Sequence, residues 1–254
     1  MTPSAQKKSL ADFFCFILDT FAQLLRPLGK HRLSWTIITR QVLFTGYEAL
    51  PLISLIALGV GGLIILQGYN LLSTFGQGIW LHRILVTVVI NELSGLITAL
   101  VVIARSGTAI STELGNMKVN REIALLKSFG IPPNSYLVVS RVWGVVASML
   151  VLTVYFNIIA VVGGWLFTRL FSPLGFRSFI FDFIGVLRLS NLLMALIKSF
   201  VFGLIISITA CYQGLSVSRA STEVPQRTIK AVVNSISVVI LADMLITWLF
   251  WVLA

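Results

Sequence analysis

The sequence predicts an all-α integral membrane protein with five transmembrane helices, an N-terminal interfacial amphipathic helix and a short cytoplasmic helix. Hydrophobic residues make up 57% of its 254 residues and charged residues only 11%, whereas a soluble domain has roughly 25% charged residues. The charged residues also separate five apolar runs, each about as long as the roughly 20 residues that a helix needs to cross hydrocarbon. Alternating ten-residue segments, which are typical of outer-membrane barrels, do not recur.

Residues 1–47 are predicted to form an amphipathic region on the cytoplasmic surface of the membrane. Its apolar residues recur at helical spacing, largely opposite the polar ones: Leu10, Phe13, Phe14, Ile17, Phe21, Leu24, Leu25 and Leu28. Asp12 and Asp19 interrupt the apolar run, which argues against a signal peptide. Packing against a neighbouring subunit would explain the same pattern, and both interpretations stay open.

Residues 48–254 form the predicted five-span domain. The expected spans are residues 49–72, 84–105, 138–168, 193–215 and 231–253. Because lipid cannot hydrogen-bond to the backbone, each span is expected to be a helix. The glycines at 59, 61, 62, 163 and 164 are expected to allow close packing or local bending of these helices. Spaced phenylalanines between residues 171 and 191 predict a second interfacial helix.

The basic residues predict the orientation of the chain. The 19 Lys and Arg exceed the 9 Asp and Glu and give a formal charge of +10. With the N-terminus in the cytoplasm, every Lys and Arg lies on the cytoplasmic side except Arg83, Arg169, Arg177, Arg188 and Lys198. The positive charge therefore indicates a cytoplasmic N-terminus and a C-terminus on the opposite side, and no nucleic-acid partner is expected.

A short helix is expected on the cytoplasmic side at about residues 110–129. The segment is too polar to cross the membrane, yet it keeps helical periodicity through Leu114, Met117, Ile123, Leu126 and Phe129. A glycine at 130 and prolines at 132 and 133 are plausible stop signals. Such a helix could dock another protein or simply connect two spans, and by itself the pattern favours the connector.

Several kinds of chemistry are poorly supported by the sequence. Its only histidines are His31 and His82, and neither the His-Glu-x-x-His pattern nor a phosphate-binding loop occurs. Cys15 and Cys211 are too few and too far apart for a cysteine-rich metal site. We therefore expect no catalytic residues, no metal and no cofactor in this chain, so that any ATP would be hydrolysed by a separate subunit. Of the possible functions, a membrane enzyme has the least support from the sequence.

Charged residues inside the spans are the best candidates for function, because each costs at least about 2.5–3.5 kcal/mol at the bilayer centre on insertion scales. Glu92 lies in the second span and Lys198 begins the fourth. They could pair with each other or share a phospholipid headgroup, and the sequence does not decide between these roles. Asp243, in the fifth span, is expected to be a structural carboxylate bonded to neighbouring helices, with proton-coupled transport as the alternative.

Many short motifs occur in one order along residues 36–250 and together resemble one family. The motifs are Arg40-Gln41, Leu50-Pro51, Leu66-Gln67-Gly68-Tyr69, Phe75-Gly76, Glu92-Leu93, Ala104 to Ala109, Thr112 to Val119, Tyr136-Leu137-Val138, Lys198-Ser199, Phe202-Gly203, Ala231 to Ser235, and Asp243 with Thr247. In this order they resemble the MlaE family, the permeases of ABC transporters that work with MCE proteins in lipid traffic and lipid asymmetry between bacterial membranes.

The resemblance implies a homodimeric permease in the bacterial inner membrane. Its expected partners are cytoplasmic ABC ATPase subunits that bind ATP and Mg, a hexameric periplasmic MCE protein and a phospholipid substrate, and it is compatible with a STAS-type regulator. The implied lipid-binding residues are Asn91, Glu92, Lys198, Tyr69 and Phe75. The implied coupling helix, about residues 110–129, would contact the ATPase through Glu113, Gly115, Met117, Arg121 and Glu122.

Two departures from the family pattern affect these roles. The family has Arg-Glu-Leu-Gly-Pro in the second span, where this sequence has Asn91 before Glu92 and lacks the proline. Arg121 reverses a charge where an ATPase would dock. The predicted function is an ATP-driven lipid permease subunit, and the alternative is a stand-alone proton- or ion-coupled transporter that uses Glu92 and Asp243.

Overall fold

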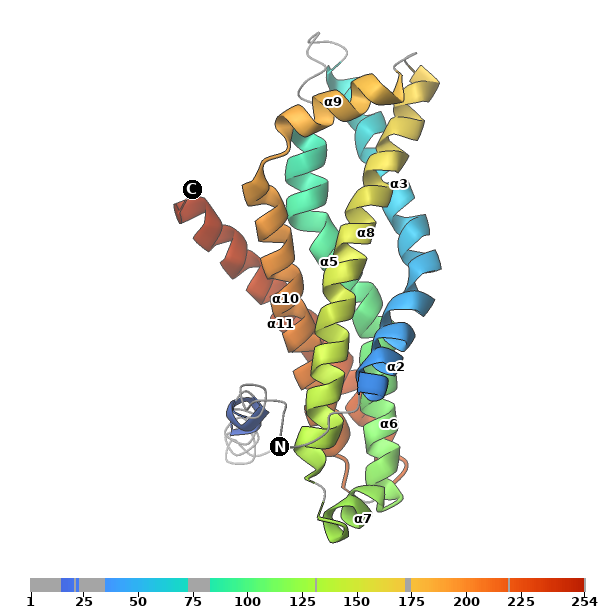
Figure 1. The fold of residues 1–254 in the computed structure, drawn as a ribbon, viewed down its shortest axis with the longest axis vertical. Helices are drawn as coiled ribbons and strands as arrows, with labels where there is room; N and C mark the ends of the chain where they lie inside the picture. Colours follow the sequence, from blue (N-terminus) through green and yellow to red (C-terminus); the bar gives the residue numbers. More distant parts are fainter. Residues whose placement is uncertain are drawn as a thin grey trace. The chain divides into compact units, whose positions relative to one another are not determined.

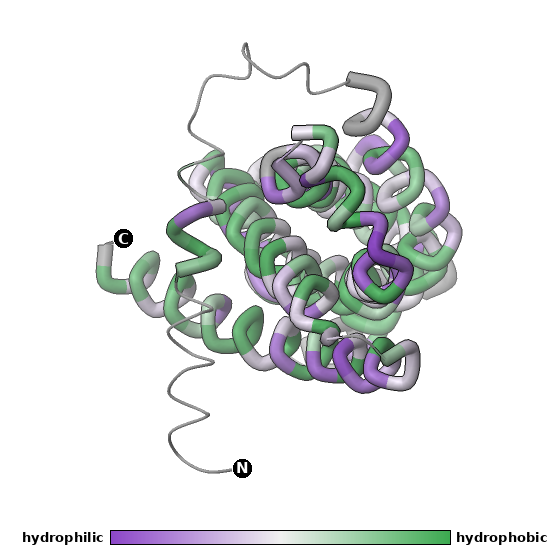
Figure 2. The backbone as a smooth tube through the Cα atoms, turned by 90° about the horizontal axis from the view of Figure 1, so that it is seen from below, coloured by the Kyte–Doolittle hydropathy of each residue, from purple (hydrophilic) through white to green (hydrophobic). Residues whose placement is uncertain are grey.

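The computed structural model describes residues 15–20, 22, 35–72, 83–130, 132–171, 175–218 and 220–253, and these residues form helices and no strand. Within this part of the chain, five helices are long and apolar enough to cross a membrane: Thr39–Gln67, Leu85–Val119, Tyr136–Arg169, Leu189–Leu215 and Glu223–Val252. Hydrophobic residues follow one another along these helices (Figure 2). The predicted all-α class with five membrane-length helices is confirmed.

Figure 1 shows the order of the helices along the chain. Helix α2 (Trp35–Gly46) leads through a 3-10 turn, Tyr47–Ala49, into α3 (Leu50–Leu72). The next long helix combines π-helical Leu85–Leu93, α5 (Ser94–Val102), π-helical Ile103–Gly107 and α6 (Thr108–Val119). It is followed by α7 (Glu122–Ser128), π-helical Asn134–Val138, α8 (Val139–Phe171), α9 (Phe176–Val186), α10 (Leu189–Leu215) and α11 (Glu223–Leu253).

The chain divides into two compact units. The first unit comprises the described residues within 1–45, 102–147 and 203–238, and the second those within 46–101, 148–202 and 239–254. Helices α8, α10 and α11 each contribute residues to both units. The last two long helices begin at Leu189 and Glu223, earlier than the expected residues 193 and 231. Helix α11 begins earlier than expected because the charged residues of its first turns are part of the helix. The sequence prediction had taken these charged residues as the boundary of the span.

In the second unit, α3 and α8 pack at backbone contact distance. A Cβ atom on Gly61 would lie 2.0 Å from the carbonyl oxygen of Ala160, and one on Gly163 would lie 2.6 Å from that of Leu58. The close-packing role predicted for these glycines is therefore confirmed. Gly59 differs, because no described atom lies within 4 Å of the Cβ position there.

Helix α9 runs across the ends of its neighbours in the second unit (Figure 1). Phe179 and Phe183 bury one face of the helix. The rings of Phe176 and Trp165 meet edge to face with their centroids 5.0 Å apart, which is a favourable arrangement for two aromatic rings. The opposite face exposes Phe181 together with the charged Asp182.

The segment predicted as one helix over residues 110–129 is divided in the structure. Helical residues continue without a break from Leu85 to Val119, and the chain then turns at Arg121, which has a φ of 60°. This left-handed conformation costs about 1–2 kcal/mol for a residue with a side chain. The backbone N–H groups of Ala124 and Leu125 donate to the Arg121 carbonyl at 3.0 and 3.1 Å and start α7. Helix α7 therefore turns away from α6 (Figure 1).

The N-terminal amphipathic region is described only in part. Residues 15–20 and 22 are helical. Within the first unit, the ring centroid of Phe16 lies 5.6 Å from that of Tyr212, and the Asn134 amide donates to Asp19 at 3.0 Å. Residues 1–14, 21 and 23–34 lie outside the described residues, so the amphipathic helix over that region stays a prediction.

Candidate functional site

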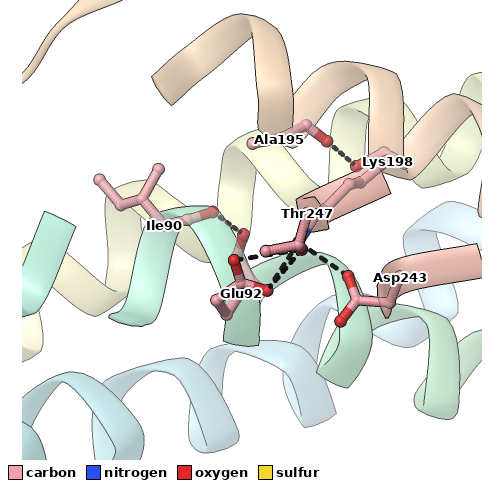
Figure 3. A network of polar contacts seen from close by, with 8 residues as sticks. Ile90, Glu92, Ala195, Lys198, Asp243 and Thr247 are labelled. Carbon is pink, nitrogen blue, oxygen red and sulfur yellow. Dashed lines mark hydrogen bonds and ion pairs between the residues drawn. The ribbon is translucent and has the colours of Figure 1, made fainter. Parts of the chain in front are cut away.

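A cluster of ionisable side chains lies among apolar helices of the second unit. The Lys198 Nζ atom of α10 lies 2.7 Å from Glu92 Oε2 and 2.8 Å from Asp243 Oδ1 of α11. The Lys198 side chain is fully buried, while those of Glu92 and Asp243 are 35% and 11% exposed. Figure 3 shows the carboxylates of Glu92 and Asp243 pointing toward the same place. We call Glu92, Lys198 and Asp243 the charge cluster.

Three features of the sequence place these side chains together. Glu92 lies in the π-helical segment Leu85–Leu93, and π-helical turns inside longer helices often occur at functional sites. Gly95 lets α10 come close to α5, because a Cβ there would lie 3.3 Å from the Phe202 ring and 3.8 Å from Lys198 Cβ. The hydroxyl oxygens of Ser199 and Thr153 lie 2.8 Å apart and connect α10 to α8 next to the cluster.

Thr247 is a fourth member of the site. Its hydroxyl lies 3.3 and 3.2 Å from the two carboxylate oxygens of Glu92, so that it can donate to either (Figure 3). Thr247 follows Asp243 by four residues, and positions four apart share one face of a helix. In the sequence, Thr247 stands out only as part of a family motif. The four-residue spacing was the signal that could have placed it in the site.

The cluster has more acceptors than donors. Two carboxylates and one ammonium give it a formal charge of −1. The ammonium has three N–H groups, and Lys198 forms an ion pair with each of the two carboxylates. Beside Glu92, the buried Oδ1 atom of Asn91 has no hydrogen-bond partner among the described residues. Of the three side chains in the cluster, Glu92 is the most exposed, so that its carboxylate is the group most open to a ligand.

The structure brings together two of the five predicted lipid-binding residues, Glu92 and Lys198, with Asn91 adjacent in the chain. It adds Asp243, which agrees with the predicted carboxylate bonded to a neighbouring helix. Tyr69 lies in α3, but its side chain is outside the described part of the structure, and Phe75 is outside it entirely. Lipid binding by all five residues stays a prediction.

In the first unit, α6 is held on several sides by the helices around it. Glu113 forms an ion pair with Arg141 of α8 at 2.9 Å, and the Thr112 hydroxyl lies 3.1 Å from that of Thr228 on α11. The Lys118 ammonium donates to the carbonyl of Leu215 at the end of α10. A Cβ on Gly115 would lie 3.1 Å from Val224. Gly115 is therefore enclosed by helices of its own unit, whereas the Glu113 side chain is 59% exposed beside its ion pair. Contact of either residue with an ATPase stays a prediction.

Helix α7, in contrast to α6, is exposed along its length. Every residue of this described helix is at least partly exposed. Arg121 and Glu122 are exposed, whereas Met117 on α6 is half-buried. The large apolar side chains of Leu125 and Phe129 are 56% and 76% exposed. Of the five predicted coupling residues, Arg121 and Glu122 therefore belong to the exposed surface beside α7.

Comparison with known proteins identifies the family. The family Permease MlaE matches residues 38–249. A probable ABC transporter permease protein of Rickettsia felis is 29% identical over 96% of this chain and 93% of its own length. The intermembrane phospholipid transport system permease protein MlaE of Haemophilus influenzae is 27% identical over 96% of this chain and 95% of its own. The chloroplastic protein TRIGALACTOSYLDIACYLGLYCEROL 1 of Arabidopsis thaliana is 27% identical over 90% of this chain and 65% of its own length.

Since the family match covers all five membrane-length helices almost completely, this chain is a multi-pass membrane protein of the MlaE permease family.

Proposed function

We propose that this chain is the permease subunit of an ATP-driven transporter that moves glycerophospholipid between the bacterial inner membrane and a periplasmic MCE protein. The observation that carries the proposal is the family match over residues 38–249. The relative from Haemophilus influenzae, a protein named for intermembrane phospholipid transport, aligns over nearly the same length. The charge cluster supports a transport role, because ionisable residues inside membrane spans usually mark a substrate or ion pathway.

The proposed assembly contains two copies of this chain. Cytoplasmic ATPase subunits bind ATP and Mg, a hexameric MCE protein lies in the periplasm, and a STAS-type regulator is compatible with the complex. The chain itself contributes no catalytic residue and no cofactor. The distribution of Lys and Arg supports a cytoplasmic N-terminus and a periplasmic C-terminus.

In this proposal the lipid headgroup lies at the charge cluster in the periplasmic half of the membrane. Glu92 presents its carboxylate to it, and Lys198 and Thr247 hold this carboxylate in place. Asn91, adjacent in the chain, is a further candidate for headgroup contact. Tyr69 and Phe75 are further candidates for lipid contact. Because a transporter must bind its substrate in one state and release it in another, the two states must differ in lipid affinity.

Helix α7 is the proposed contact with the ATPase. Its exposed Leu125 and Phe129 provide an apolar surface, and Arg121 and Glu122 provide charges beside it. The Glu113–Arg141 ion pair ties α6 to α8, so that a force applied at α7 would reach α8 through α6 as well as through the chain. In this proposal α7 binds the ATPase, and α6 connects α7 to α8.

The subunits of the complex should co-purify from solubilised membranes. We expect the full chain, purified in mild detergent through a tag, to bring an ABC ATPase and an MCE protein with it. Phe129→Ala should reduce the recovered ATPase at least about tenfold, since removing one central aromatic anchor commonly costs 2 kcal/mol or more. Phe181→Ala on α9 is the matched control, because Phe181 is 79% exposed and Phe129 76%. Quantitative mass spectrometry of the eluted subunits measures both effects.

The alternative, a stand-alone proton- or ion-coupled transporter, has one observation in its favour, because Glu92 and Asp243 both contact Lys198. It predicts that the chain purifies without an ATPase and that Phe129→Ala changes nothing. Equal loss of the ATPase in the Phe129 and Phe181 variants would contradict docking through α7.

A further inference from the structure

We propose that the charge cluster selects phospholipids whose headgroup carries a primary ammonium and disfavours headgroups with a net negative charge. The inference rests on the proposed lipid-transport function and adds the chemical class of the lipid. It follows from two properties of the cluster, which are its formal charge and the kind of hydrogen-bonding atom it leaves open.

The charge of the cluster is the first property. Lys198 is fully buried and lies within 2.8 Å of both carboxylates, so that its charge is already compensated inside the protein. The second carboxylate leaves a formal charge of −1. A charge among apolar helices is costly unless a partner of opposite sign is present. A bound cation supplies that partner, whereas an anionic headgroup adds to the imbalance.

The second property is the supply of acceptors. The Glu92 side chain is 35% exposed, and among its described contacts its carboxylate receives only Lys198 and Thr247. An ionised carboxylate has about four acceptor positions. A primary ammonium has three N–H donors, and it can therefore occupy the acceptor positions that Lys198 and Thr247 leave open on Glu92.

An arrangement built for an anionic headgroup would look different. Phosphate and carboxylate groups are held in proteins by exposed N–H donors of Arg, Lys or the backbone. Here the one ammonium of the site is enclosed and already bonded, and the exposed edge belongs to a carboxylate. The cluster therefore attracts the amine end of a zwitterionic headgroup, and the lipid phosphate lies farther from Glu92 than the amine does.

The test uses photoreactive phosphatidylethanolamine and phosphatidylglycerol with identical acyl chains, offered at equal concentration to the complex purified through the full chain in phosphatidylcholine nanodiscs. We expect the ethanolamine probe to label wild type more strongly. Asn91→Arg brings the formal charge of the site to zero and should lower the ethanolamine-to-glycerol labelling ratio about tenfold or more. One unit charge about 6–8 Å away at an effective dielectric constant of about 20 is sufficient for this change.

A control variant isolates the charge. Ser178→Arg places the same positive charge at an exposed position on α9, a helix that carries no residue of the charge cluster, and should keep the wild-type ratio. If Asn91→Arg does not assemble, Glu92→Gln removes the same net charge without adding bulk and should lower the ratio in the same direction.

The outcomes separate this inference from the proposed function. Equal labelling of wild type by both probes, or stronger labelling by phosphatidylglycerol, overturns the headgroup inference while lipid binding stands. An unchanged ratio in both Asn91→Arg and Glu92→Gln also overturns it, because the cluster charge would then be balanced by something other than the lipid. Absence of labelling by either probe contradicts the proposed function together with the inference.

Discussion

Replacement of Lys198 by Met should lower the free energy of unfolding by about 3–5 kcal/mol, the usual cost of removing one partner from a buried ion pair. Lys198 contacts Glu92 at 2.7 Å and Asp243 at 2.8 Å, and its side chain is fully buried. Its loss leaves two carboxylates without their shared cation. The measurement is equilibrium unfolding of the purified chain in mixed detergent micelles, followed by circular dichroism.

Two comparisons make the Lys198 result specific. Lys230→Met removes an exposed lysine of α11 and should change stability by no more than about 0.5 kcal/mol. Adding Glu92→Gln and Asp243→Asn to Lys198→Met should restore most of the lost stability, because no unpaired charge then stays buried. A Lys198→Met variant as stable as wild type would mean that the cluster is open to water in the folded protein.

Replacement of Gly61 by Ala should disrupt the packing of α3 on α8. The added methyl group would lie 2.0 Å from the Ala160 carbonyl oxygen, and a backbone carbonyl inside a helix cannot move aside as a flexible side chain can. Overpacking of a core commonly costs about 1–3 kcal/mol and sometimes more, and we expect this site to reach at least the upper value. Unfolding in detergent and the yield of folded protein on size-exclusion chromatography measure the effect.

Gly59→Ala is the matched control for Gly61→Ala. Both positions lie in α3, but the Cβ of residue 59 meets no described atom within 4 Å. Alanine forms helices better than glycine by about 0.8–1 kcal/mol in water, so that this variant should be as stable as wild type or slightly more stable. Equal destabilisation by the two substitutions would contradict the close approach of α3 and α8.

The sequence predicted those parts of the fold that depend on composition and spacing. Five apolar runs were sufficient to predict five membrane-length helices, and the glycines at 61 and 163 indicated close packing. The division between α6 and α7 could not be predicted in this way. Apolar periodicity continues across Arg121, and the left-handed backbone at that residue carries no glycine or proline signal.

The sequence predicted only part of the candidate site, because the rest depends on how the helices pack. Glu92 and Lys198 were recognised because a charge within an apolar run is conspicuous, and their pairing was one of two stated possibilities. That Asp243 contacts the same lysine depends on how α11 packs on α10 within the second unit, which spacing along one helix does not specify. The ion pair between Glu113 and Arg141 could not be predicted either, because it depends on how α6 packs on α8 within the first unit.

The most direct measurement is phospholipid transfer by the complex purified through this chain and reconstituted into liposomes, with fluorescent phospholipid as cargo and the soluble MCE domain as its partner. Transfer should require ATP hydrolysis and should be lost when the phosphate-binding lysine of the ATPase subunit is substituted. Transfer that persists in that variant, or that the isolated chain performs in response to a proton gradient, would contradict an ATP-driven permease and favour a secondary transporter.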